Sequence, residues 1–200
     1  MNLLSRTAIL AMAAGLGACS VGSMLGGGGK PPATLVTLTP EVGEPAQIVR
    51  IASAGQDVTI ETPVVSKELR SVRVPVQVNP SDVQYVANLQ LIDTPDRLFA
   101  DLLAETVRRT TSRVVLNPSQ SALDPGLVVT GELQRFGFDA ATGQVIVQYD
   151  GSLSTASGNR VETRRFTATV AADGTAPTVG PALNRAANEV AINVAKWIGG

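Results

Sequence analysis

The sequence predicts an α+β fold, in which two helices pack on one face of an antiparallel β-sheet. Three observations favour this fold. Apolar and polar residues alternate in several segments, two stretches carry an apolar stripe at helical spacing, and short turn sequences join strands that follow one another. The order is strands, helix, strands, helix, and we expect it to form one domain over residues 34–200.

The first strands are indicated by two-residue periodicity. Alternation over 58–64 predicts one strand. The alternating segments 72–78 and 83–91 flank residues 79–82, an Asn-Pro-Ser-Asp sequence typical of turns, and therefore predict a β-hairpin. Pro75 has no backbone donor, so the first arm should lie at an edge of the sheet or contain a bulge.

A first helix is predicted after this hairpin. Thr94 is expected to cap it through its hydroxyl, Pro95 to occupy the first helical position, and Asp96 to lie near the positive end of the helix dipole. Apolar residues at spacing four over 98–107 form one stripe. The helix should end near Ser112.

The second half of the chain predicts strands and a terminal helix. A short strand is expected at 114–116, and short turns separate strands at 127–138, 144–153 and 162–170, which indicates an antiparallel meander. The last helix is predicted at 181–198. Its apolar face carries Leu183, Ala186, Ala187, Val190, Val194 and Ile198. Its polar face carries Asn184, Arg185, Asn188, Glu189 and Lys196.

The N-terminal residues have the pattern of a bacterial lipoprotein leader. Residues 1–18 contain Arg6, then an apolar run, then small residues, in the order of a cleaved signal peptide. Residues 16–19 read Leu-Gly-Ala-Cys and resemble the lipobox, so we expect cleavage before Cys19 and lipid attachment to its thiol. Residues 19–33 are predicted to be a flexible Gly- and Pro-rich linker.

The composition argues against catalysis and against nucleic-acid binding. The chain has no histidine, and its single cysteine is the expected lipid attachment site, so we expect no enzyme, no cofactor and no metal site. The net charge of −1 gives nothing to attract nucleic acid. The arginines form two groups, one at 108, 109 and 113 and one at 160, 164 and 165. Each group is either a solvated face or a contact to anionic lipid head groups.

Three stretches together resemble the family of ABC-type transport auxiliary lipoproteins. They are residues 72–98, which include the hairpin and the helix start, residues 127–136, and the end of the terminal helix at 195–198. The resemblance implies a partner of an ABC permease, its ATPase and a mammalian-cell-entry (MCE) domain protein, which move phospholipids between two membranes. It also implies an outer-membrane position on the periplasmic face, since Ser20 is not the Asp that retains lipoproteins in the inner membrane.

Other interpretations remain open at this level. One is a carrier that binds lipid in a cavity between sheet and helices, which filling of that space by apolar side chains such as Leu102 and Val190 would exclude. Another is a purely structural envelope lipoprotein. Trp197 is a candidate partner contact, although a terminal tryptophan more often packs on its own sheet. Assembly into a homo-oligomer is also left open.

Overall fold

The computed structural model describes residues 35–45, 51, 56–119, 126–155 and 161–199. The chain divides into two units, residues 1–31 and 32–200, and all described residues belong to the second. The predicted signal peptide, Cys19 and the whole predicted linker therefore lie outside the described residues. The elements are β1 (Asp57–Ile60), β2 (Val64–Val65), η2 (Lys67–Leu69), β3 (Arg73–Asn79), β4 (Asp82–Gln90), α1 (Pro95–Thr110), β5 (Val114–Leu116), β6 (Leu127–Asp139), β7 (Gln144–Thr155), β8 (Val161–Ala171) and α2 (Ala176–Gly199).

The α+β class is confirmed, but the sheet is mixed rather than antiparallel throughout. Strands β6, β7 and β8 form the predicted antiparallel meander, and β3 pairs antiparallel with β4. On its other edge, β6 pairs in parallel with β1, β2 and β3, and β1 pairs in parallel with β5. Short turns force antiparallel pairing, whereas the long connection from β1 to β5 contains α1 and allows the parallel arrangement.

The predicted hairpin is present, and its first arm is irregular at Pro75. The pairing shifts between Arg73 and Pro75, as expected of a bulge at a residue without a backbone donor. In β4, Asn88 has a φ of 57°, a left-handed conformation that asparagine tolerates. The strand predicted at 58–64 is interrupted, because Glu61–Pro63 separate β1 from β2.

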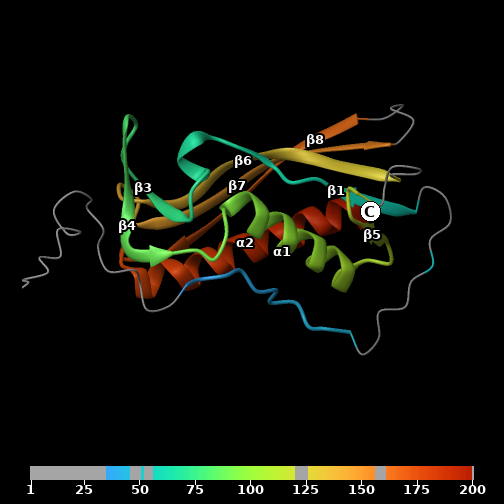
Figure 1. Cartoon of the computed structure of the whole chain (residues 1–200), viewed down its shortest axis with the longest axis horizontal. Helices are drawn as coiled ribbons and strands as arrows, with labels where there is room; N and C mark the ends of the chain where they lie inside the picture. The colour runs from blue at the N-terminus through green and yellow to red at the C-terminus, as the bar shows by residue number, and fades with distance from the viewer. Residues whose placement is uncertain (1–34, 46–50, 52–55, 120–125, 156–160, 200) are drawn as a thin grey trace, which may run out of the picture. The chain divides into compact units, whose positions relative to one another are not determined.

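Both helices cover the same face of the sheet, as predicted (Figure 1). Tyr149 of β7 and Phe166 of β8 are directly paired, so their side chains point to the same face. Tyr149 contacts Phe99 of α1 at a centroid distance of 5.2 Å, and Phe166 contacts Trp197 of α2 at 5.4 Å. The layer between sheet and helices is thus one continuous core.

The helix starts differ from the sequence predictions. Thr94 is at the N-cap of α1, but its side chain makes no capping hydrogen bond; Asp93 instead accepts from the Thr94 amide at 2.7 Å. Helix α2 begins at Ala176, before the predicted start at Pro181. Asp173 accepts hydrogen bonds from Thr175 and Thr178, and this cap starts the helix one turn earlier.

The predicted apolar face of α2 is buried, but one residue of the predicted polar face is buried with it. Asn188 is 1% exposed, because its amide is used in hydrogen bonds to the N-terminal segment of the domain. No helix among the described residues combines the length and the apolar character needed to cross a membrane.

Candidate functional site

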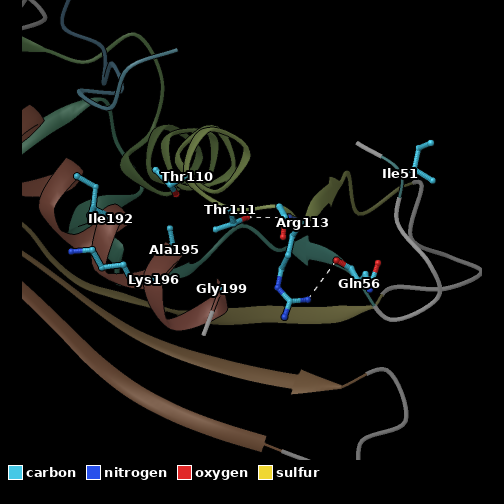
Figure 2. A pocket seen from close by; sticks show the side chains of 10 residues that line it. Ile51, Gln56, Thr110, Thr111, Arg113, Ile192, Ala195, Lys196 and Gly199 are labelled. Atoms are coloured by element: carbon cyan, nitrogen blue, oxygen red, sulfur yellow. Dashed lines mark hydrogen bonds between the residues drawn. The ribbon is translucent and has the colours of Figure 1, made fainter. Parts of the chain in front are cut away.

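Two adjoining grooves lie where helix α2 ends. The first, of about 790 Å³, is bounded by the end of α1, the residues that enter β5, and the last turns of α2 (Figure 2). The second, of about 440 Å³, lies between the end of α2 and the ends of β6, β7 and β8. Arg113 and Lys196 line both, so we treat them as one site and call it the paired grooves.

Arg113 forms the wall that separates the two grooves. Its Nε donates to the carbonyl oxygen of Ile198 at 2.9 Å, and its Nη1 donates to the carbonyl oxygen of Gln56 at 3.5 Å. The guanidinium thus satisfies a free carbonyl at the end of α2 and lies at the negative end of the helix dipole. Figure 2 shows Arg113 reaching from the end of α1 toward Gln56. This arginine holds three separate parts of the chain together.

Trp197, the candidate partner contact, lines the second groove. It packs on Phe166, and its indole N–H donates to Glu162 Oε1 at 2.7 Å. The ring also lies over Gly151, where an added Cβ would be 3.2 Å from it. The tryptophan is therefore held against its own sheet and presents a half-buried ring to the groove. Its role toward a partner stays a prediction.

In each of the two predicted groups of arginines, some members pair with carboxylates. Arg109 and Arg108 pair with Glu105 at 2.7 Å and 3.4 Å, and the hydrogen bond from Arg109 lowers the pKa of Glu105. Arg165 makes two hydrogen bonds to Asp150, at 2.7 Å and 2.6 Å. These arginines thus have carboxylate partners away from the paired grooves.

The positive charge that remains at the paired grooves comes from three side chains. Arg113 and Lys196 line both, and the exposed Arg164 joins the second, 3.9 Å from Glu162. Arg160 lies outside the described residues. Glu162 also lines the second groove, so the net positive charge of the paired grooves comes from Arg113 and Lys196 and suits binding of a partner that carries negative charge.

The hydroxyl groups of the first groove are engaged in the helix. Thr110 donates to the Thr106 carbonyl at 2.8 Å, and Thr111 donates to the Val107 carbonyl at 2.9 Å. Among the described residues, no group of three or more acidic, cysteine or histidine side chains could hold a metal ion. The paired grooves therefore offer side chains that can bind a partner.

A second feature, not anticipated from the sequence, is an extended segment that lies along α2. Residues 36–42 form it, and we call it the strap. The Thr39 amide donates to Asn184 Oδ1 and the Glu41 amide donates to Asn188 Oδ1, both at 2.8 Å. Asn188 Nδ2 donates back to the Thr39 carbonyl at 2.9 Å. Two asparagines one turn apart on α2 thus bind the strap backbone.

The strap runs in the same direction as α2 and ends at α1. Its first residue, Val36, pairs with Leu91 after β4 and lies beside Gly180 near the start of α2. At its other end, Arg109 of α1 donates to the Val42 carbonyl at 3.0 Å. The described chain therefore begins at the end of the domain opposite the paired grooves (Figure 1).

Fold and site together describe an α+β domain with a buried apolar core and the paired grooves at one end. The family model for the ABC-type transport auxiliary lipoprotein component matches residues 37–195. The chain therefore belongs to this family, which is a family of transport auxiliary lipoproteins and not a known enzyme family.

Solved structures share the fold. A crystal structure of a Xanthomonas campestris protein from the family DUF330 matches with a TM-score of 0.70 and 17% identity, covering 84% of this chain and 95% of that one. The crystal structure of an uncharacterized protein matches with a TM-score of 0.59 and 14% identity, covering 75% of this chain and 96% of that one. No curated protein sequence matches the chain. At these identities the likeness concerns the fold alone.

Proposed function

We propose that this chain is the lipid-anchored auxiliary component of an ABC transport system with an MCE-domain protein, and that it acts at the periplasmic face of the outer membrane. This transport system would move phospholipids between membranes, and its ABC permease and ATPase would be further partners of the chain. The match of residues 37–195 to the auxiliary lipoprotein family carries this proposal. The expected lipid on Cys19 and the serine at position 20 support the position.

The filled interior favours docking over lipid carriage. The side chains whose burial would exclude an internal lipid cavity are all in the core: Leu98, Leu102, Val190 and Val194. The two grooves of about 790 Å³ and 440 Å³ lie at the surface, where α2 ends. The domain's work is therefore assigned to its surface, by binding and without catalysis.

The paired grooves are placed to meet a partner away from the anchoring membrane. Val36 lies beside Gly180, and sixteen residues of α2 separate Gly180 from Lys196. At 1.5 Å per residue, the paired grooves lie about 24 Å farther along the helix than the point where the strap begins. A membrane anchor before the strap would leave the grooves facing the periplasm.

The test is capture of the partners by the full-length lipoprotein after mild detergent extraction and chemical crosslinking. We expect the MCE-domain protein, with the permease and ATPase in substoichiometric amounts. Lys196→Glu should reduce capture at least several-fold, because it reverses a charge at both grooves. Arg185→Glu is the matched control, an exposed cation on the same helix three turns away. Equal capture by both variants contradicts the assigned surface, and an absence of MCE protein with the unaltered chain contradicts the function and favours a structural lipoprotein.

Two substitutions test the anchor and its position. Cys19→Ala should abolish labelling by a fatty-acid analogue, since the sequence has no other thiol. Ser20→Asp should leave the protein level unchanged but hold the protein at the inner membrane, with the detergent sensitivity of a deletion strain. Membrane fractionation and detergent survival measure both effects. Relocated protein with normal resistance, in a strain whose deletion is sensitive, argues against the outer-membrane role.

A further inference from the structure

Three segments lie side by side where the described chain begins. The Val36 amide donates to the Gln90 carbonyl at 2.8 Å, and the Ile92 amide donates to the Val36 carbonyl at 2.9 Å. The Leu91 amide donates to the Val72 carbonyl at 2.8 Å. The start of the strap, the end of β4 and the residue before β3 thus form one surface, which we call the exit surface. It lies at the end of the domain opposite the paired grooves (Figure 1).

The exit surface carries exposed aliphatic side chains. Leu35 is 53% exposed, Ile92 is 54% exposed and Val72 is 36% exposed. In the pairing of Val36 with Leu91, side chains alternate, so Leu35 and Ile92 point away from the side on which Leu91 is buried. Of the seven large hydrophobic side chains that are exposed among the described residues, Leu35 and Ile92 share this side. Val72 is opposite Leu91 in the hairpin and therefore points to the other side. Exposed aliphatic side chains that share one side mark contact with a partner or with lipid.

Arginines and a tyrosine border these aliphatic side chains. Arg73 is paired with Gln90 across the hairpin, and its guanidinium lies 4.0 Å above the ring of Tyr85. Arg97, in the first turn of α1, is exposed and lies 3.7 Å from Asp93. Aliphatic residues beside arginine and tyrosine are typical of surfaces that rest on a bilayer, since cations reach lipid phosphates while apolar groups enter the acyl boundary.

The strap fixes the distance of this surface from the anchor. The hydrogen bonds of Thr39 and Glu41 to α2 hold the strap in place, and Leu35 immediately precedes it. Sixteen peptide steps separate Leu35 from Cys19, and a chain of that length reaches at most about 55 Å. A lipid on Cys19 therefore limits the exit surface to within about 55 Å of the bilayer and attaches the domain at the end opposite the paired grooves.

We propose that the exit surface, through Leu35, Arg73 and Ile92, rests on the phospholipid bilayer that holds the lipid anchor. This inference depends on the anchor proposed above. The contact would orient the domain on the membrane, with α2 leading away from the bilayer and the paired grooves in the periplasm. A second protein covering the same surface is the alternative outcome of the test.

The test places spin labels on the mature lipidated protein in vesicles of phosphatidylethanolamine and phosphatidylglycerol. Single thiols are introduced as Leu35→Cys and Ile92→Cys. The matched control is Val161→Cys, because Val161 is an equally exposed aliphatic residue, 66% exposed, at the other end of the domain. Labels on the exit surface should be at least several-fold more accessible to oxygen than to a water-soluble nickel complex, relative to the control label.

The outcomes separate the two proposals. Protein that does not float with the vesicles contradicts the anchor itself. Protein that floats, but whose labels at 35 and 92 are as accessible to nickel as the label at 161, contradicts the bilayer contact alone. Labels that become shielded from both relaxing agents only when the transport partners are added show that a protein covers the surface, and this also overturns the inference.

Discussion

Asn188 offers the sharpest test of how the domain is held together. Its buried side chain accepts from the Glu41 amide and donates to the Thr39 and Asn184 carbonyls, at 2.8 Å, 2.9 Å and 2.9 Å. Asn188→Ala removes three hydrogen bonds worth about 1 kcal/mol each, while the better helix propensity of alanine returns about 0.6 kcal/mol. We expect the free energy of unfolding to fall by about 2 kcal/mol, which lowers Tm by about 4–8 °C in a domain of this size.

Two measurements distinguish loss of the strap from general destabilisation. Urea unfolding gives the free energy, and hydrogen exchange followed at single amides reports the strap. The Glu41 amide should exchange much faster in the variant, and the Thr39 amide less so, because Thr39 donates to Asn184. Glu189→Ala is the control, an exposed change on the same helix that should cost no more than about 0.5 kcal/mol. Unchanged exchange at Glu41, or a cost equal to that of the control, would refute the role of Asn188.

Three further predictions concern the core, a helix cap and a tight strand contact. Leu102→Asp places a charge at a side chain that is 2% exposed and should cost several kcal/mol, seen as loss of protease resistance, while Leu102→Met should stay resistant. The hydrogen bond from Thr178 helps to lower the pKa of Asp173 to about 2. The loss of stability in Asp173→Asn should therefore be full above pH 4 and should vanish as the pH falls toward 2. Thermal melts at several pH values measure this loss, and a loss that does not change with pH contradicts the prediction. Gly131→Ala puts a methyl group 2.4 Å from a backbone oxygen of β7 and should cost about 1–3 kcal/mol in urea unfolding, whereas Gly43→Ala, with nothing within 4 Å, should not.

The elements predicted from the sequence are those whose signal is local. The strands of the meander and the stripe of α1 follow from periodicity, because each strand or helix buries one face against the same core. Even the bulge in β6 leaves a trace in the sequence. The buried apolar residues of β6 fall on odd positions up to Leu133 and on even positions from Phe136, and the pairing shifts between Leu133 and Arg135.

The parallel pairs and the strap could not be predicted in this way. The pairing of β1 with β5 and β6 depends on contacts between segments far apart in the chain. The alternation in β1 indicates a strand but not that both of its faces are buried. The strap alternates apolar and polar residues from Val36 to Val42, but this local pattern does not indicate its partners, because its amides bind side chains about 145 residues away. Asn188 was misplaced on the polar face for the same reason: its partners belong to the strap.

The candidate site shows the same limit. Trp197 lies at the paired grooves, as a partner contact would, but its hydrogen bond to Glu162 could not be deduced from spacing. Arg113 was grouped with Arg108 and Arg109, yet it turns away from them to the end of α2. The acceptor of Arg113 belongs to α2, at the other end of the chain, so the spacing of the arginines cannot predict this contact.

If Cys19 carries the proposed lipid anchor, the strap also sets which end of the domain is attached to it. With the strap bound to α2, the anchor is sixteen peptide steps from Leu35, at the exit surface. If the strap were released, the chain would first join the fold at β1, and Gln56, immediately before β1, lines the paired grooves. The anchor would then attach at the groove end through 37 peptide steps, a reach of up to about 130 Å. On this proposal Asn184 and Asn188 set the point of attachment as well as the stability, and losing them would move that point from the exit surface to the paired grooves.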